Sequence, residues 1–152
     1  MYFVDKIKKE FKNKDLTIFV DMDGVVADYD FGTPLDFKNK RPITTNIKTI
    51  EELSKLKNVE VKILSICRKN NQIHDKLEWL NHNMPFITED NRFIISKETI
   101  SKSSKEIKLD FLRKYITDNK TIILIDDDNA ILKYIKDNLH NIILFQDSSI
   151  ID

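Results

Sequence analysis

The chain has 152 residues, of which 25 are basic and 25 are acidic, so its formal net charge is zero. Its hydrophobic content of 41% with 33% charged residues is ordinary for a globular domain and excludes a disordered chain. We expect no membrane span and, because there is no net basic charge, no extended surface for nucleic acid. The length predicts a single domain over residues 1–152.

Helical and strand-like patterns alternate along the chain. The expected helices are 2–12, 46–57, 73–81, 104–117 and 129–137, and the expected strands are 17–20, 59–66, 92–96, 121–125 and 141–145. Such alternation predicts an α/β fold with a doubly wound parallel sheet that helices cover on both faces. One helix and one strand must fit between residues 28 and 65, which leaves room for a minimal cap domain or none.

Two acids, Asp21 and Asp23, directly follow the first apolar strand. Open α/β sheets place their chemistry at the carboxyl ends of the strands. Residues i and i+2 of an extended chain share a face, and Gly24 permits a sharp turn, so the two carboxylates can converge on one ligand. The alternative is an acidic turn without a function.

A second acidic group follows the strand at 121–125 and consists of Asp126, Asp127 and Asp128. Two strands that both end in acids indicate a shared edge. Grouped carboxylates raise one another's pKa, so a divalent cation is expected between them, and an all-oxygen site favours Mg²⁺. Asp128 is expected to cap the following helix rather than to bind metal.

Two further features lie between the acidic groups. Ser65 is near the end of a strand, where its hydroxyl could donate to a phosphate oxygen or satisfy a loop backbone group. The sequence SSKE from Ser103 to Glu106 predicts a capping box at the start of a helix. Several lysines lie near this helix start, and one of them could balance the charge of the acids, although most lysines of this chain are expected to be solvated.

In this order, acid pair, hydroxyl, lysine and second acid group resemble the four motifs of the haloacid dehalogenase (HAD) superfamily. DMDGVVAD resembles the first motif, DxDGxxxD; ILS resembles the second, a lysine of the 103–118 helix would be the third, and LIDDDNAI resembles the fourth. Within the superfamily, VDMDGVVAD and LIDDD are similar to 5′(3′)-deoxyribonucleotidases. EIKLDFL is similar to the phosphatase domains of polynucleotide kinases.

The resemblance implies a role for each matching residue. Asp21 would be the nucleophile that forms an aspartyl-phosphate, and Asp23 would protonate the leaving oxygen and then activate water. Mg²⁺ would be held by the Asp21 side chain, the Asp23 main-chain carbonyl and either Asp127 or Asp126. Ser65 and the lysine would bind the transferred phosphoryl group.

The resemblance also names the lysine and one further contact. Lys108 has the spacing of the kinase-linked phosphatases, with Lys105 and Lys102 as the alternatives. Arg68 is the candidate substrate contact of the second motif, where SICR has one residue more than the related SGR pattern.

The segment from Asp28 to Asn46 is expected to set specificity. Its aromatic and cationic side chains could stack on a base or contact a phosphate, or could simply pack the loop and be solvated. They are Tyr29, Phe31, Phe37, Lys38, Lys40 and Arg41.

The remaining side chains with chemical potential are expected to be structural. Cys67 is the only cysteine, which excludes an intrachain disulfide and predicts a small buried thiol, and Trp79 is expected in the core. The histidines have no spacing typical of a zinc site. The amino-terminal segment does not resemble a signal peptide, so we expect a cytoplasmic protein.

The expected function is therefore Mg²⁺-dependent hydrolysis of a phosphomonoester, with a nucleotide or polynucleotide-end phosphate as the favoured small substrate. One alternative is a phosphatase of the same superfamily that acts on a non-nucleotide metabolite. The other is a non-catalytic phosphoacceptor domain, because receiver domains also combine acids, a hydroxyl and a lysine. The motif order favours the enzyme, since in receivers the lysine comes last.

Overall fold

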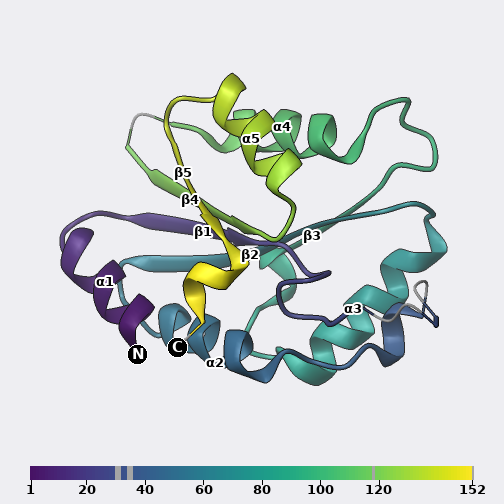
Figure 1. The fold of residues 1–152 in the computed structure, drawn as a ribbon, viewed down its shortest axis with the longest axis horizontal. Coiled ribbons are helices and arrows are strands. Elements are labelled where there is room, and N and C mark those ends of the chain that lie inside the picture. The colour runs from purple at the N-terminus through teal and green to yellow at the C-terminus, as the bar shows by residue number, and fades with distance from the viewer. Residues whose placement is uncertain (30–31, 34–35, 118, 152) are drawn as a thin grey trace.

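The computed structural model describes residues 1–29, 32–33, 36–117 and 119–151. A five-stranded sheet with the order β3-β2-β1-β4-β5 forms its centre (Figure 1). All neighbouring strands are parallel. The strands are β1 Leu16–Val20, β2 Val59–Cys67, β3 Arg92–Ser96, β4 Thr121–Asp126 and β5 Ile142–Gln146. This topology confirms the predicted doubly wound parallel α/β fold.

Helices cover both faces of the sheet. In Figure 1, α4 and α5 lie above the strands, and α1, α2 and α3 lie below them. The α-helices are α1 Tyr2–Glu10, α2 Thr44–Ser54, α3 Asn71–Asn83, α4 Ser104–Tyr115 and α5 Asn129–Asn138. Three short 3₁₀ helices, η1 Phe37–Asn39, η2 Glu89–Asn91 and η3 Asp147–Ile150, complete the described elements.

The central strand β1 contributes side chains to two hydrophobic cores. Ile18 and Val20 pack in the core between the sheet and helices α1, α2 and α3. Phe19 points to the opposite face and packs in the core beneath α4 and α5, where its ring meets Phe111 edge-on at a centroid distance of 5.7 Å. Both faces of β1 are buried, and every residue of the strand except Thr17 is apolar, which is why the strand was recognisable in the sequence.

The structure departs from the expected ranges at the ends of elements, by one residue in several strands and by more in some helices. The helix expected at 46–57 begins at Thr44 and ends at Ser54. It stops there because the amides of Lys55 and Leu56 bond to the carbonyls of Glu52 and Leu53 in tight turns that lead into β2. The helix expected at 73–81 runs from Asn71 to Asn83.

Between β1 and α2, the described residues contain η1 as their one regular element. This agrees with the expectation of a minimal cap, whereas a single domain over residues 1–152 stays a prediction. No helix in the described part of the chain has both the length and the apolar character needed to cross a membrane.

Helix α4 begins with the predicted capping box. The Ser103 side chain accepts a hydrogen bond from the Glu106 amide, and the Glu106 carboxylate accepts one from the Ser103 amide. This reciprocal pair satisfies two amides that the first helical turn would otherwise leave without partners. The cap therefore fixes where α4 starts, and with it the direction in which the next turn points.

We expect Ser103→Ala to lower the free energy of unfolding by about 1 kcal/mol, because the amide of Glu106 loses its acceptor. Urea denaturation of the two proteins measures this difference. Ser101→Ala, at an exposed position just before the helix, is the matched control and should change stability by less than about 0.5 kcal/mol. Equal stability of both variants would contradict the cap.

Candidate active site

The two acidic groups meet at the carboxyl edge of the sheet. β1 and β4 are neighbours in register, with Val20 beside Ile125, and the Asp21 amide donates to the Ile125 carbonyl at 3.0 Å. Asp21, Asp126 and Asp127 each place a carboxylate oxygen within 4.8 Å of the others. The structure thus brings these three predicted site residues together.

Lys108 projects from α4 into this acidic cluster. Its ammonium nitrogen lies 2.6 Å from Asp126 Oδ2 and 3.2 Å from Asp21 Oδ1, and its side chain is nearly buried. The two alternative lysines point elsewhere: Lys102 pairs with Asp110 on the surface, and Lys105 lies over the Tyr134 ring. Of the three candidates, Lys108 alone contacts the acids.

Burial dominates the protonation of this cluster. It raises the pKa of Asp21 to about 7 against the opposing effect of Lys108, and the neighbouring charge of Asp126 adds to the rise. Burial also raises the pKa of Asp126, although Lys108 opposes it. For Lys108, burial would lower the pKa, but Asp21 and Asp126 outweigh it and the pKa rises. The acids therefore repel one another and hold the lysine charged.

The donor set of the cluster suits Mg²⁺, since three carboxylates converge and all donors are oxygen. Gly24 makes the approach of Asp127 possible. It has a φ of +80°, and a Cβ at this position would lie 2.1 Å from Asp127 Oδ2. Tyr29 also orients this oxygen with a hydroxyl hydrogen bond of 2.9 Å. A cation held here would remove the repulsion between the acids.

Asp126 and Asp127 occupy different environments. Asp126 is fully buried, and its oxygens accept hydrogen bonds from Lys108 and from the Asp128 amide. Asp127 is half-buried, and burial is the main cause that raises its pKa. Asp128 caps α5 by accepting from the amides of Ala130 and Ile131, as the sequence predicted.

Asp23 turns to a different set of partners. Lys40 contacts its Oδ1 at 2.8 Å, and Lys76 contacts its Oδ2 at 2.7 Å. Burial alone would raise the pKa of this carboxyl, but the two ammonium groups outweigh burial and lower it. Asp21 and Asp23 are two residues apart in sequence, yet their pKa values move in opposite directions.

Ser65 is fully buried near the end of β2, beside β1. Lys76 donates to its hydroxyl oxygen at 2.8 Å. The same ammonium therefore joins Ser65 to Asp23, a connection that the sequence analysis missed. A signal was present, because Lys76 falls on the apolar face of α3 that Ile73, Leu77 and Leu80 define by helical spacing.

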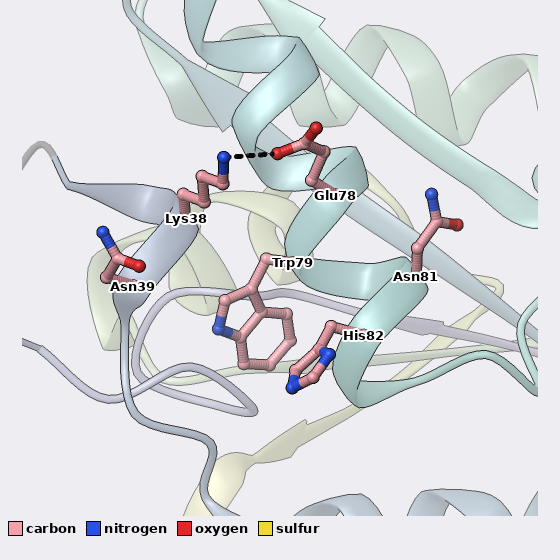
Figure 2. A pocket seen from close by; sticks show the side chains of 6 residues that line it. All are labelled: Lys38, Asn39, Glu78, Trp79, Asn81 and His82. Carbon is pink, nitrogen blue, oxygen red and sulfur yellow. Dashed lines mark ion pairs between the residues drawn. The ribbon is translucent and has the colours of Figure 1, made fainter.

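Among the cations of the loop before α2, Lys40 belongs to the site, whereas Lys38 and Arg41 lie on the surface. Lys40 is buried against Asp23, and the Phe37 ring lies 4.5 Å from its ammonium. By contrast, Lys38 is exposed and pairs with Glu78 (Figure 2). Arg41 is also exposed and pairs with Asp28. The predicted loop residue Phe31 lies outside the described residues.

A cleft of about 560 Å³ opens beside Asp23. Tyr29 and Phe37 contribute aromatic walls, and the side chains of Arg68 and Lys97 add positive charge. Arg68 is exposed, and its amide donates to Gln72. Arg68 lines the cleft, and contact with the substrate stays the prediction for this residue.

Two residues that were predicted to be structural, Cys67 and Trp79, are buried in the structure. Cys67 is a buried free thiol whose pKa is raised by burial, which confirms the expectation for it. Trp79 is buried in the core as predicted, and its indole donates to the Lys40 carbonyl at 2.7 Å. Figure 2 shows the indole facing the segment that carries Lys38 and Asn39.

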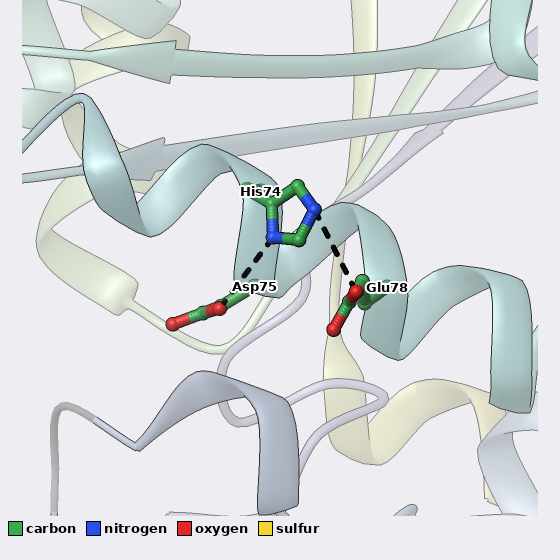
Figure 3. Close-up of side chains that lie close together, drawn as sticks. All are labelled: His74, Asp75 and Glu78. Carbon is green, nitrogen blue, oxygen red and sulfur yellow. Dashed lines mark ion pairs between the residues drawn. The ribbon is translucent and has the colours of Figure 1, made fainter.

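A second group of possible metal ligands lies on α3. Figure 3 shows His74 between Asp75 and Glu78, with nitrogen to oxygen distances of 3.8 and 3.6 Å. The His74 side chain is 75% exposed, and Glu78 also pairs with Lys38. These contacts join a neighbouring residue and the next turn of one helix at its surface, and we assign them no part in the candidate active site.

Comparison with known proteins finds similarity in structure but not in sequence. No family model matches the chain, and no curated protein matches it significantly. A chain from the structure of the Pnkp1/Rnl/Hen1 RNA repair complex superimposes with a TM-score of 0.70 at 16% identity. The match covers 88% of this chain and 42% of that one, so the chain spans less than half of its length.

Two further solved structures match over most of their own length. The HAD domain of the effector protein Lem4 from Legionella pneumophila matches with a TM-score of 0.57 at 15% identity, over 88% of this chain and 85% of that domain. The class C acid phosphatase from Bacillus anthracis, solved with tungstate bound, matches with a TM-score of 0.55 at 16% identity, over 96% and 74%. The chain therefore has the fold of an HAD domain.

Proposed function

We propose that this protein is a Mg²⁺-dependent phosphomonoester hydrolase that works through an aspartyl-phosphate. The observation that carries the proposal is the position of Lys108, whose ammonium contacts Asp21 and Asp126 at the carboxyl edge of the sheet. A buried cation between two carboxylates is suited to bind the charge of a phosphoryl group transferred to one of them. Asp23 lies two residues after Asp21, at the same edge of the sheet, and supplies the second carboxylate that such a reaction needs.

In the first step, an oxygen of Asp21 attacks phosphorus and the bond to the leaving oxygen breaks. Asp23 enters this step protonated, gives its proton to this oxygen and is left as the carboxylate that Lys40 and Lys76 stabilise, so an alcohol leaves. In the second step, Asp23 takes a proton from water while the water oxygen attacks phosphorus. The bond to Asp21 breaks, and inorganic phosphate is released. Lys108 and the Ser65 hydroxyl bind the phosphoryl oxygens throughout.

Mg²⁺ bound by Asp21, the Asp23 carbonyl and Asp126 or Asp127 would neutralise negative charge at the site. In the protein without metal, the pKa of Asp21 is raised to about 7, which disfavours the ionised nucleophile at neutral pH. Positive charge beside this carboxylate favours its ionised form. The acidic cluster thus gives a physical reason for metal dependence.

We propose a nucleotide or a polynucleotide-end phosphate as the substrate. The cleft beside Asp23 combines the aromatic side chains of Tyr29 and Phe37 with the cations Arg68 and Lys97. Aromatic rings can stack on a base, and cations can pair with a further phosphate. The structural similarity to a chain of an RNA repair complex supports the same substrate class.

A screen of phosphomonoesters tests the function and the substrate class together. It would compare nucleoside 3′- and 5′-monophosphates, 3′-phosphorylated oligonucleotides and sugar phosphates, each with Mg²⁺ and with EDTA. Release of phosphate that requires Mg²⁺ supports the proposal, and a preference for sugar phosphates would contradict the nucleotide assignment. Absence of turnover with every substrate would contradict the hydrolase itself.

The nucleophile can be removed almost without a change of shape. We expect Asp21→Asn to lower kcat by at least about 1,000-fold, because an amide cannot attack phosphorus. Circular dichroism and thermal melting should show a folded protein. Activity within about tenfold of wild type contradicts the assignment of Asp21. A stable phosphorylated wild type without turnover would instead indicate a phosphoacceptor domain.

The three lysines near the start of α4 provide an internal comparison. We expect Lys108→Met to lower kcat by at least about 100-fold, because the phosphoryl group loses a buried positive charge. Lys102→Met and Lys105→Met should stay within about twofold of wild type, since their ammonium groups lie on the surface. Assays at a temperature where all three variants are folded separate this effect from loss of stability.

Metal binding can be tested at Asp127, which is only half-buried. Asp127→Asn should weaken Mg²⁺ binding measured by titration calorimetry, because one carboxylate ligand loses its charge. In EDTA the variant should melt no lower than wild type, since the raised pKa shows that its charge is unfavourable in the metal-free protein. Unchanged Mg²⁺ affinity would contradict the placement of the metal.

A further inference from the structure

Lys76 is a fully buried lysine whose contacts lead to two candidate site residues. Its ammonium lies 2.7 Å from Asp23 Oδ2 and 2.8 Å from Ser65 Oγ. We propose that Lys76 is a positioning residue that fixes the Asp23 carboxylate and the Ser65 hydroxyl for phosphoryl transfer, with Lys40 as its partner on Asp23. This inference rests on the proposed phosphatase function and adds to it a residue that the motifs do not contain.

The environment of Lys76 leaves its ammonium little freedom. Burial of a charged amine is costly unless its hydrogen-bonding capacity is satisfied. An ammonium has three N–H donors, and Lys76 finds three acceptors: Asp23, Ser65 and, at a longer distance of 3.4 Å, the Ile66 carbonyl. The side chain is therefore held from several directions, and it can hold its partners in turn.

Lys40 contacts the carboxylate oxygen of Asp23 that Lys76 does not. It contacts Oδ1 at 2.8 Å, so each carboxylate oxygen of Asp23 has its own ammonium. The Phe37 ring lies 4.5 Å from both ammonium nitrogens, a distance that allows a cation–π contact with each. Asp23 cannot rotate without breaking one of two part-buried ion pairs.

Helix α3 positions both lysines. Lys76 belongs to α3, and Trp79 lies on its next turn. The Trp79 indole donates to the Lys40 carbonyl at 2.7 Å, which ties the loop that carries Lys40 to the same helix. The view in Figure 2 shows this indole turned toward the loop. The geometry of Asp23 therefore depends on one rigid element of the fold.

The contact with Ser65 has a directional consequence. An ammonium can only donate hydrogen bonds, so the Ser65 oxygen must accept from Lys76. The hydroxyl hydrogen then points away from Lys76 and is available to another acceptor. Ser65 lies near the carboxyl end of β2, next to β1 and the turn that bears Asp21. A phosphate oxygen bound at this edge is the acceptor that the proposed function supplies.

Lys62 provides the matched comparison. It is also a largely buried lysine on the sheet, but its ammonium pairs with Glu60 and Asn91, which lie outside the candidate site. Loss of Lys62 removes a buried amine without touching Asp23 or Ser65. Any effect that Lys76 shows and Lys62 does not is therefore an effect on the site rather than a general cost of losing a buried lysine.

The experiment compares two kinds of leaving group in wild type, Lys76→Met, Lys40→Met and Lys62→Met. The leaving alkoxide of an alkyl phosphomonoester needs a proton from Asp23, whereas p-nitrophenolate leaves without one. For each protein, kcat and KM are measured with an alkyl phosphomonoester. The first turnover with p-nitrophenyl phosphate is followed by rapid mixing, and thermal melting monitors the fold.

We expect Lys76→Met to lower kcat for the alkyl substrate by about 100-fold and the first turnover of p-nitrophenyl phosphate by less than about tenfold. Its KM should rise, because Ser65 is no longer oriented. Lys40→Met, which touches Asp23 and not Ser65, should lower kcat for the alkyl substrate by about tenfold with little change in KM. Lys62→Met should stay within about twofold in every measurement.

Three outcomes would overturn the inference. One is a Lys76→Met variant whose kcat for the alkyl substrate matches that of Lys62→Met. Another is an equal loss with both leaving groups, which would show general damage instead of lost positioning. If Lys76→Met does not fold, Lys40→Met provides the test. The third outcome is then a Lys40→Met variant that loses the same factor of activity with both leaving groups. A wild type inactive on all phosphomonoesters overturns the proposed function, whereas the other outcomes leave that function standing.

Discussion

The carboxyl edge of this sheet concentrates buried charge, and the ion pair of Lys108 with Asp126 holds that charge in place. The two groups lie 2.6 Å apart, and their side chains are almost completely buried. An unpaired charge at such depth would cost several kcal/mol, so neither partner can be lost alone without a large penalty. Both come from elements fixed by other means: Asp126 by strand pairing with β5, and Lys108 by the capped helix α4.

Two charge clusters of opposite balance lie side by side at this edge. The first contains the three carboxylates of Asp21, Asp126 and Asp127, and Lys108 contacts Asp21 and Asp126. In the second, Lys40 and Lys76 face the single carboxylate of Asp23. The first cluster has the charge and the oxygen donors to attract a divalent cation, whereas the second repels one. A phosphate dianion bound between them would meet the metal on one side and the surplus ammonium charge on the other.

The sequence predicted the acids better than the lysines. The apolar runs before Asp21 and Asp126 are buried on both faces, so the strands and the edge where they end could be inferred from pattern alone. Lys108 required the resemblance to known motifs. Lys76 was missed, and Lys40 was named only as a loop cation that could contact a phosphate or be solvated. The burial of both depends on tertiary contacts: for Lys76, on which face of α3 packs inward, and for Lys40, on the loop that Trp79 anchors. A charged residue within an apolar helical face was the one local signal available.

Asp21 and Asp23 are two residues apart, but their different surroundings give them opposite pKa shifts. Among like charges, burial raises the pKa of Asp21 to about 7, while two lysines lower the pKa of Asp23 despite its burial. In the proposed reaction Asp21 attacks as a carboxylate, and a cation that binds beside it would favour this ionised form. The positive charge beside Asp23 is instead built into the chain, which keeps metal ions away from its side chain. In the proposed reaction this pairing stabilises the carboxylate that Asp23 becomes after it gives up its proton, and the sharp turn at Gly24 is what allows neighbouring acids to reach such different environments.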